Sequence, residues 1–377
     1  MKRWKIFAVF IVTISLLAGC AFPHSPSAEQ PESSSTETDP SAEDNPGRPD
    51  GEFADPNSIP PREGLVRSVL TNEWIDEEIA GNRPIAVIIP NEVRAVPQYT
   101  LSQADVIYEA KVEGNMTRLM ALYQDWQGLK KIGNVRSLRS YFAYWAFEWD
   151  SVIIHYGGPY FIYDLLEQEN TETIDGQYES SAYYRTADRE APHNAYTSGK
   201  NLTTSIEKKG YSLERRGIAD ETHFVFAPAN APNTLTQYGS DAVDASYIDM
   251  TEAYPLTRCY FEYDEETETY YRSQYLSGGF DGPHTDGANG KQLAFSNILV
   301  QRVKQEDIGN GYLSMQCHDT TRDGWFFTRG KGIHVTWEKV SDYGSTRFYD
   351  DNQLQVELNT GKTMILIIRD TDEFTYR

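Results

Sequence analysis

The sequence predicts an α+β protein in which a mixed α/β domain is followed by a β-rich, mainly antiparallel domain. Short runs rich in β-branched and aromatic residues recur from about residue 84 to the end, each bounded by Gly, Pro, Asn or Asp. Helical patterns occur only in the first part, and the chain becomes strand-dominated near residue 220. We therefore predict two domains of ordinary size, at residues 62–220 and 221–377.

The segment before these domains begins with a secretion signal. Residues 1–19 combine a cationic start, an apolar run too short to span a bilayer, and Leu17-Ala18-Gly19 directly before Cys20, which is typical of a bacterial lipoprotein signal peptide. Cleavage before Cys20 would make its thiol the attachment point for lipid, a diacylglycerol with palmitate-type chains. The alternative is a plain signal peptide in which a cysteine follows by chance. We predict a protein anchored by lipid to the cell membrane, on the extracytoplasmic face.

Residues 20–61 form an acidic segment with few large apolar side chains. It holds nine Asp and Glu residues against Arg48 alone, and such a composition cannot bury enough surface to offset its ordering entropy. We predict a disordered tether that holds the folded part away from an anionic membrane. The whole chain has a formal net charge of −22, and the folded part has no stripe of Lys and Arg, so nucleic acid is not an expected partner.

Secondary structure in the first part alternates between strand and helix patterns. The strands predicted from compact apolar runs are Pro84–Ile89, Val106–Ala110, Thr117–Tyr123 and Ser151–His155. The helices predicted between Gly and Pro residues are Ser140–Trp149, Tyr160–Gln168 and Asn201–Lys209.

The second part is predicted to consist of strands. Cys259–Tyr263 and Thr269–Ser273 flank an acidic connector and resemble a hairpin. The further predicted strands are Leu293–Val303, Gly324–Thr328, Ile333–Trp337, Leu354–Leu358 and Thr363–Ile368. We expect an antiparallel sheet or a small barrel.

Two features of this part could carry a covalent bond or a metal. Cys259 and Cys317 could form a disulfide outside the cytoplasm, or each could be a buried free thiol. The loop from Asp281 to Asp286, which contains His284, has residue types that ligate metals, but we interpret it as a solvated hairpin loop. No cofactor is expected.

Several motifs in the same order along the chain resemble the YerB-like lipoproteins of Gram-positive bacteria. They run from about residue 70 to the end and include Leu101-Ser102-Gln103-Ala104-Asp105, Val112-Glu113-Gly114, Thr117-Arg118, Lys131-Ile132-Gly133, Ala191-Pro192-His193-Asn194, Val335-Thr336-Trp337 and Asn359-Thr360-Gly361. The resemblance implies a lipoprotein with a mixed N-terminal domain and a β-rich C-terminal domain. It implies no particular function and no catalytic residues. Pro90-Asn91 and Gly133-Asn134-Val135 depart from the expected pattern, which weakens any role for an acid at position 90.

Polar residues beside strand ends and turns are the candidates for a catalytic or binding site. They are Glu109, Glu113, Arg118, Arg136, Arg139, His155, Arg185, His193 and Asn194. Glu109 and Glu113 could act as an acid and base pair, or could form ion pairs with arginines. His155 and His193 could titrate in a site, or could be structural. No serine-hydrolase elbow, phosphate loop or zinc-protease helix is present.

The aromatic content suggests a ligand surface. The chain contains 25 Tyr, and Tyr141–Trp145 and Tyr183–Arg185 are clusters that would suit sugars or peptides if exposed, or the core if buried. We therefore carry two hypotheses. The first is a binding or assembly module for an envelope component, such as a wall glycan, a peptide or a surface protein. The second is an envelope hydrolase or transferase that uses His155 or His193 with Glu109 or Glu113.

Overall fold

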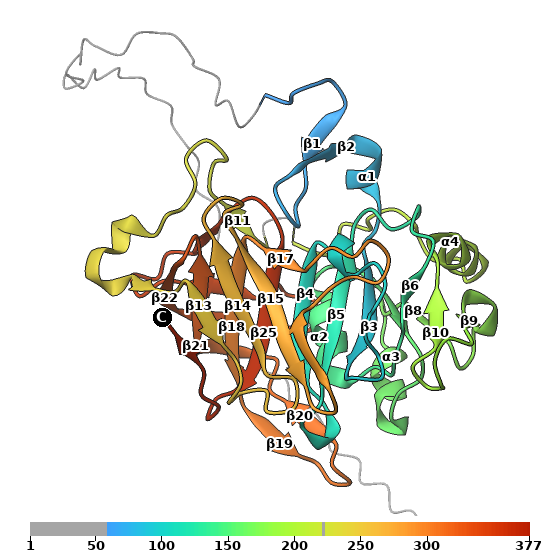
Figure 1. Ribbon diagram of the computed structural model, residues 1–377. Coiled ribbons are helices and arrows are strands. Elements are labelled where there is room, and N and C mark those ends of the chain that lie inside the picture. Colours follow the sequence, from blue (N-terminus) through green and yellow to red (C-terminus); the bar gives the residue numbers. More distant parts are fainter. Residues whose placement is uncertain (1–58, 221–222) are drawn as a thin grey trace, which may run out of the picture. The chain divides into compact units, whose positions relative to one another are not determined.

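The computed structural model describes residues 59–220 and 223–377, in which strands predominate over helices (Figure 1). The predicted signal peptide, Cys20 and all but the last three residues of the predicted tether lie outside the described residues. Among the described residues, no helix is long and apolar enough to cross a membrane.

An eleven-stranded mixed sheet forms the centre of the structure. Its order is β12-β22-β21-β18-β25-β4-β5-β3-β7-β8, with β23 beside β22. Its strands are β3 (Ile85–Asn91), β4 (Val106–Lys111), β5 (Thr117–Tyr123), β7 (Val152–His155), β8 (Thr173–Asp175), β12 (Val243–Asp244), β18 (Asn297–Val303), β21 (Asp319–Thr328), β22 (Lys331–Lys339), β23 (Arg347–Tyr349) and β25 (Thr363–Arg369). Strands from both predicted domains therefore share one sheet, and the boundary between residues 220 and 221 remains a prediction.

Strand direction in this sheet places several strand ends at the same edge. β7 pairs in parallel with β3 and β8, while β25 pairs in parallel with β4 and β18. β5 is antiparallel to both β3 and β4, so β3, β4, β7 and β8 point the same way. The carboxyl ends of these four strands meet at one edge, which we call the carboxyl edge. Ligands of open sheets that contain parallel strands commonly bind outside such an edge.

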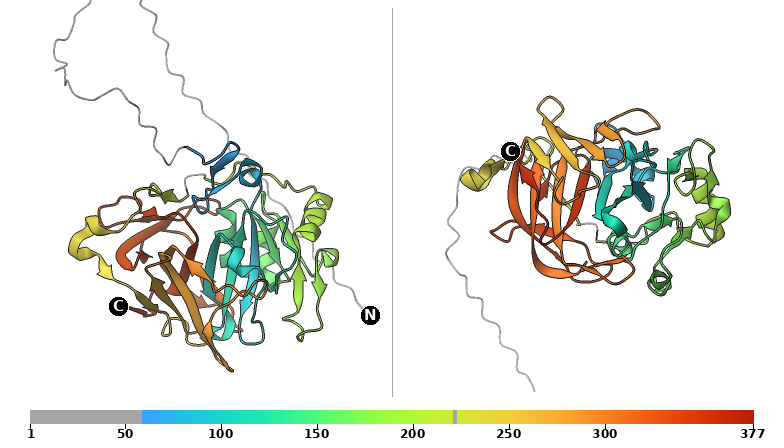
Figure 2. Two further views of the ribbon diagram at one scale, coloured as in Figure 1. Left: turned by 45° about the horizontal axis from the view of Figure 1, so that its top comes forward. Right: turned by 60° about the horizontal axis from the view of Figure 1, so that its bottom comes forward.

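A second sheet and two helices cover the faces of the central sheet (Figures 1 and 2). The second sheet contains β13 (Tyr247–Asp249), β14 (Cys259–Asp264), β15 (Thr269–Leu276), β16 (Phe280–Pro283), β17 (Ala294–Phe295) and β26 (Thr375–Tyr376). Its Phe261 and Tyr270 share one apolar core with Val87 of β3, and α4 (Gly199–Lys208) packs into the same core. On the other face, α2 (Ser140–Phe147) packs against Ile88. β3 is buried on both faces because each of its faces is covered.

The remaining strands and helices of the described residues are short. The remaining strands are β1 (Leu65–Arg67), β2 (Trp74–Asp76), β6 (Ile132–Gly133), β9 (Tyr184–Arg185), β10 (Ala195–Thr197), β11 (Val225–Phe226), β19 (Gln305–Asp307), β20 (Leu313–Met315) and β24 (Glu357–Leu358). The remaining α-helices are α1 (Glu77–Gly81) and α3 (Tyr163–Leu166). Single turns of 3₁₀-helix occur at Leu101–Gln103, Glu113–Asn115, Tyr160–Ile162 and Ser180–Ala182, and a longer one at Thr236–Asp241.

The predicted elements of the first part are mostly present, and the second part is β-rich and mainly antiparallel as expected, but some of its strands join the central sheet instead of forming a barrel of their own. The strand Thr117–Tyr123 has the predicted bounds, whereas the helix predicted at Tyr160–Gln168 is a 3₁₀ turn followed by the four residues of α3. β18 and β25 do not close an antiparallel barrel. They pair in parallel with each other and extend the sheet of the first part, because their apolar residues are buried on both faces.

Candidate functional site

At the carboxyl edge, a segment inserts between the parallel strands β3 and β7. The backbone N–H of Arg136 donates to the carbonyl of Ile88 (2.8 Å), and the N–H of Tyr156 donates to the carbonyl of Arg136 (3.0 Å). This segment therefore lies between the ends of β3 and β7. It places Arg136 and the neighbouring Arg139 at the edge, beside the residues that follow β3 and β4.

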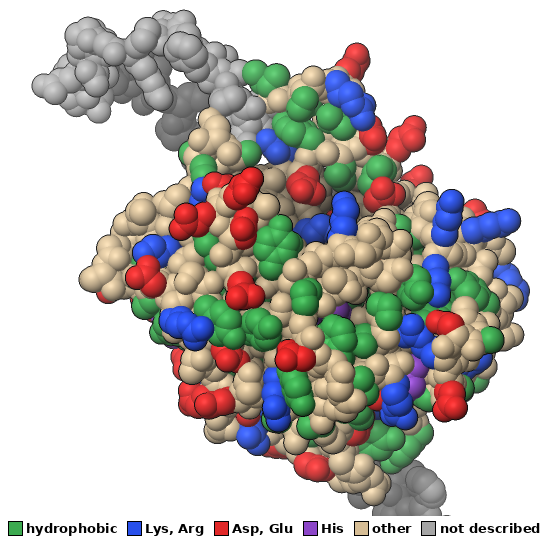
Figure 3. All heavy atoms as spheres, viewed as in Figure 1, with side chains coloured by type: hydrophobic (Ala, Val, Ile, Leu, Met, Phe, Trp, Pro, Cys, Tyr) green, Lys and Arg blue, Asp and Glu red, His purple; other side chains and the backbone are tan. Residues whose placement is uncertain are grey.

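Six arginines surround this edge in a chain that is otherwise strongly acidic. We call them the arginine cluster, and they are Arg94, Arg118, Arg136, Arg139, Arg185 and Arg189. The nearby acidic groups that pair with them or with His193 are Glu92, Glu113 and Asp188. Basic side chains and a histidine are visible on the right of Figure 3, over the region of β9 and β10. The cluster therefore carries more positive than negative charge.

Arg139 is the one member of the arginine cluster whose guanidinium binds both oxygens of a carboxylate. Its Nε and Nη2 donate to the two oxygens of Glu113 at 2.5 and 2.6 Å. Burial alone would raise the pKa of Glu113, but the hydrogen bonds and charge of Arg139 lower it below its usual range. The bidentate geometry holds both side chains in place. Glu113 is therefore not a free general base in this conformation.

Arg118 and Arg136 are less well compensated. Arg118 is buried and its Nη1 donates to the carbonyl of Ser137 (2.5 Å), a neutral partner. Burial, followed by repulsion from Arg139 and Arg136, lowers the pKa of Arg118 to about 9. Burial also lowers the pKa of Arg136, against the attraction of Glu92, and the buried Nε of Arg136 has no hydrogen-bond partner. Both guanidiniums retain unused capacity to bind an anion.

These two arginines line a small cavity. It has a volume of about 20 Å³ and is bounded by Pro90, Asn91, Glu92, Val112, Met116, Thr117, Arg118 and Arg136. Such a volume holds little more than one water-sized group. The cavity can accept the tip of a ligand, and the body of the ligand would lie outside it.

His193 and Asn194 border the same cluster. The Nε2 of His193 lies 3.3 Å from a carboxylate oxygen of Glu92, and burial lowers the pKa of His193. The side-chain carbonyl of Asn194 accepts from Arg185 (2.7 Å), and its amide donates to the carbonyl of Thr186 (2.9 Å). The predicted residues His193, Asn194, Arg118, Arg136, Arg139 and Glu113 thus belong to one region.

His155 and Glu109 lie in the interior. His155 is fully buried, its Nδ1 is 3.0 Å from the carbonyl of Gly157, and burial lowers its pKa. Glu109 is fully buried on the face that meets the second sheet, where it accepts from Arg272 (2.8 Å) and Thr117 (2.6 Å). Glu109 and Glu113 therefore bind different arginines, on different parts of β4 and its following turn.

The interior network around Glu109 also contains the loop considered for metal binding. Arg272 is hydrogen-bonded to His284, whose Nε2 lies 2.9 Å from the side-chain oxygen of Gln98. Asp286 accepts from the backbone N–H groups of Thr100 (2.8 Å) and Ser102 (2.9 Å). The prediction of a solvated loop was wrong, because both His284 and Asp286 are buried. Within the described ranges no group of three or more His, Cys, Asp or Glu residues could hold a metal ion.

The two cysteines in the described part of the chain are free thiols. Cys259 lies in the Glu109 network, with its Sγ 3.8 Å from Glu109 Oε2. Cys317 is near the carbonyls of Met315 and Tyr141. The two thiols are buried on opposite sides of the central sheet and cannot meet. The possible disulfide between them was therefore wrong. Burial raises the pKa of each thiol, so neither resembles a reactive cysteine.

Three aromatic residues, one exposed and two partly buried, lie next to the arginine cluster, and the sequence interpretation did not single them out. The guanidinium of Arg139 is 5.6 Å from the ring centre of Tyr312. The ring of Phe161 is 5.2 Å from that of Tyr312 and 5.6 Å from that of Tyr160, which is 86% exposed. We call Tyr160, Phe161 and Tyr312 the aromatic row. By contrast, Tyr141, Phe142 and Trp145 of the predicted cluster lie in the core.

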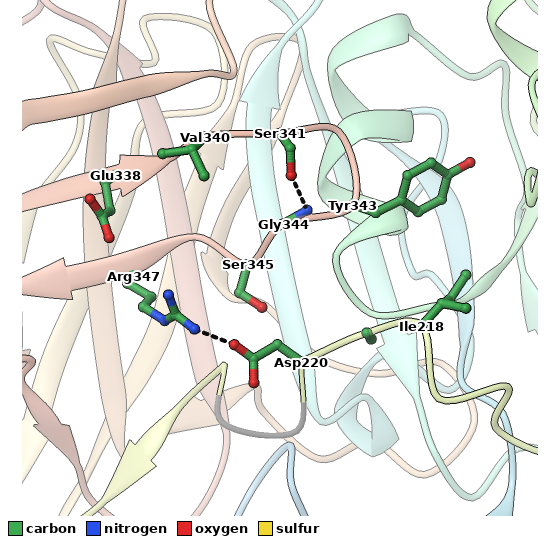
Figure 4. Close-up of a pocket in the computed structure, with 10 residues that line it drawn as sticks. Ile218, Asp220, Glu338, Val340, Ser341, Tyr343, Gly344, Ser345 and Arg347 are labelled. Atoms are coloured by element: carbon green, nitrogen blue, oxygen red, sulfur yellow. Dashed lines mark hydrogen bonds and ion pairs between the residues drawn. The ribbon is translucent and has the colours of Figure 1, made fainter. Parts of the chain in front are cut away.

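A larger hollow lies elsewhere, between the segment at Ile218–Asp220 and the loop after β22 (Figure 4). It has a volume of about 410 Å³. Arg347 and Asp220 form an ion pair in it, and the hydroxyl of Ser341 accepts from the backbone N–H of Gly344 (3.0 Å). Its charged groups already have partners, so it has less capacity for a charged ligand than the arginine cluster.

Comparison with known proteins places the chain in a family. Residues 70–212 match the N-terminal domain model, and residues 249–365 the C-terminal domain model, of a family described as "Protein of unknown function (DUF3048)". A protein of Bacillus subtilis (strain 168) named "Putative lipoprotein YerB" is 28% identical over 320 residues, which cover 84% of this chain and 90% of that protein.

A solved structure agrees with this relationship. The crystal structure of the YerB protein from Bacillus subtilis matches with a TM-score of 0.69 and 26% identity, over 82% of this chain and 99% of that one. The family models cover the carboxyl ends of β3, β4, β7 and β8 and the strands β14 to β17 of the second sheet. The chain therefore belongs to the DUF3048 family of YerB-like proteins.

Proposed function

We propose that this protein is a lipid-anchored, extracytoplasmic binding module that recognises an envelope component at its carboxyl edge. The lipoprotein-type signal directly before Cys20 and the name of the Bacillus relative, a putative lipoprotein, support the anchor. For the first part of the chain we retain the α+β class, since α2 and α4 cover opposite faces of its strands.

The observation that carries the binding proposal is the excess of arginine at the carboxyl edge. Arg118 and Arg136 are held close to Arg139 even though the three repel one another, and burial together with this repulsion lowers the pKa of Arg118 and of Arg136. Unfavourable arrangements of this kind are found where a ligand completes the charge balance. The adjacent aromatic row offers apolar ring faces for the rest of the ligand.

The geometry favours binding over the hydrolase or transferase hypothesis. Each carboxylate considered as an acid or base is hydrogen-bonded to an arginine, Glu109 to Arg272 and Glu113 to Arg139. His155 is buried at the end of β7. His193 is near Glu92, which also faces Arg136.

Binding to isolated cell walls tests the proposal. The detergent-solubilised full chain is expected to sediment with walls, and Arg136→Glu should reduce the bound fraction at least tenfold by reversing the charge that meets the ligand. Arg258→Glu is the matched control, because Arg258 is an exposed arginine that lies over an aromatic ring, Tyr275. Equal sedimentation of all three proteins, or none with the unaltered chain, would contradict the proposal.

The anchor is tested separately. Cys20→Ser should abolish incorporation of a labelled fatty acid and release the protein from the membrane fraction. Retained label in this variant would contradict lipid attachment at Cys20.

A further inference from the structure

We propose that the carboxyl edge binds a saccharide that carries a carboxylate, with the carboxylate in the cavity of Arg118 and Arg136 and the sugar ring on the aromatic row. This inference rests on the proposed binding function and specifies its ligand class. Three observations carry it: the charge of the cavity, its size, and the aromatic row beyond Arg139.

The charged residues that line the cavity have a net charge of one positive unit, which one negative charge on a ligand would balance. Its charged lining residues are Arg118, Arg136 and Glu92, two cations and one anion. Arg139 adds no free charge, because both of its donor groups that face Glu113 are already bonded to that carboxylate. A ligand with a single carboxylate would therefore complete the balance.

The cavity also favours a small planar anion. Its volume of about 20 Å³ admits about one oxygen-sized group, the tip of a carboxylate, and leaves little room for a tetrahedral phosphate. The buried Nε of Arg136 has no partner, and guanidinium groups bind carboxylates through parallel hydrogen bonds. Arg136, which lines the cavity, therefore has an unused donor that could serve a carboxylate.

The aromatic row extends outward from this point. Arg139 is near Arg118 but does not line the cavity, and its guanidinium is 5.6 Å from the ring centre of Tyr312; Phe161 and Tyr160 continue the row to the surface. Tyr160 is the most exposed of the large apolar or aromatic residues in the described part of the chain. Sugar rings pack on such exposed aromatic faces, while their polar groups remain in water. A peptide would need backbone hydrogen-bond partners along its path, for which the aromatic row offers only ring faces.

The experiment uses the full chain and compares four probes by titration calorimetry. They are an oligosaccharide of glucuronic acid, its neutral glucose counterpart, a glucose phosphate and a short acidic peptide. We expect the glucuronic acid oligosaccharide to bind at least tenfold more tightly than the neutral one, because a charge-assisted hydrogen bond distinguishes them. Arg136→Gln should remove this difference. Arg136→Lys, which keeps the charge but loses the paired donors, should remove most of it.

The aromatic contribution is tested with Tyr160→Ala. This variant should weaken binding of both oligosaccharides about fivefold, because it removes stacking and leaves the cavity intact. Arg258→Gln and Tyr275→Ala, at another arginine and tyrosine contact, should bind as the unaltered chain does. Circular dichroism spectra verify that each variant folds.

The remaining outcomes show whether the ligand class alone or the binding function as well is wrong. Tighter binding of the sugar phosphate or of the peptide would overturn the saccharide carboxylate, as would equal binding of the acidic and neutral oligosaccharides. If wall sedimentation depends on Arg136 but no acidic saccharide binds, the ligand class is wrong and the binding function stands. If neither depends on Arg136, both are wrong.

Discussion

The two faces of β4 and β5 present arginine and carboxylate in opposite ways. In the interior, Glu109 and Arg272 are both fully buried and form an ion pair. Thr117 and Asn91 donate further hydrogen bonds to the carboxylate of Glu109. At the carboxyl edge, Arg118 has a backbone carbonyl as its partner and other arginines as its neighbours. The residue types are the same in the two regions, but the balance of charge and the depth of burial differ.

This difference separates structure from recognition. A buried pair with matched charges is costly to break, because the remaining ion cannot regain water. An unmatched cluster near the surface is costly to keep, and it is retained only where something outside the chain balances it. Substitutions in the two regions should therefore change stability by different amounts and in different directions.

The largest effect is expected from Glu109→Gln. This change leaves the guanidinium of Arg272 in the interior without a negative partner, and we expect a loss of about 3–5 kcal/mol in the free energy of unfolding. Urea unfolding followed by tryptophan fluorescence measures it. A loss below about 1 kcal/mol would show that the interior network does not depend on its ion pair.

A second interior group gives a prediction about pH. His223 is buried with its ring 3.9 Å from that of Trp149, and burial lowers the pKa of His223 to about 4. The unfolded chain, with a histidine pKa of about 6.5, binds more protons between these values, so stability falls as the pH decreases from 6.5 to 4. We expect this histidine to account for a loss of about 2–3 kcal/mol.

The variant His223→Phe keeps an aromatic ring beside Trp149 and should lack this part of the acid sensitivity. Unfolding by urea at pH 7.5 and pH 5 measures the difference. His334→Gln, at a partly exposed histidine, is the control and should resemble the unaltered chain. If His223→Phe loses as much stability on acidification as the unaltered chain does, His223 is not the titrating group.

Glu113→Gln addresses the pair at the carboxyl edge and should have a smaller effect. The carboxylate is 22% exposed, so water replaces part of what Arg139 provides, and we expect a loss of about 1 kcal/mol at pH 7. Because the pKa of Glu113 is lowered in the folded state, this contribution exists above pH 4.5 and disappears as the pH falls below it.

Glu268→Gln is the matched control for this pair. Glu268 binds Arg329 with a bidentate geometry, but its side chain is 51% exposed. Its replacement should change the free energy of unfolding by less than about 0.5 kcal/mol. Equal losses for the two variants would mean that the Glu113 pair is an ordinary surface ion pair.

The elements of the first part could be predicted because their signals are local. Thr117–Tyr123 and Ser140–Phe147 are runs whose composition and flanking residues specify strand and helix. The pairing of β25 with β4 could not be predicted, since it joins residues more than 250 positions apart and depends on the packing of both faces.

Part of the candidate site could also be predicted, because its residues lie where local sequence signals mark the ends of strands. His193, Arg136 and Glu113 lie beside strand ends, where polar residues in a single sequence already indicate a site. That Glu109 would bind Arg272 was not visible, because the partner comes from β15 in another sheet. The exposure of Tyr160 and the proximity of Phe161 to Tyr312 also depend on the fold, and the pair Tyr160-Phe161 after Pro159 gives no local signal of either.

The smallest expected effect, and the sharpest contrast with Glu109, comes from Arg136→Gln. Removing this cation relieves its repulsion of Arg118 and Arg139, so the variant should be as stable as the unaltered chain or about 0.5 kcal/mol more stable. Added salt screens like charges, and 0.5 M sodium chloride should therefore stabilise the unaltered chain more than the variant. Urea unfolding at low and high salt measures both effects. A loss of more than about 1 kcal/mol would instead make Arg136 a structural residue like Arg272, and the cluster would no longer need a ligand to explain it.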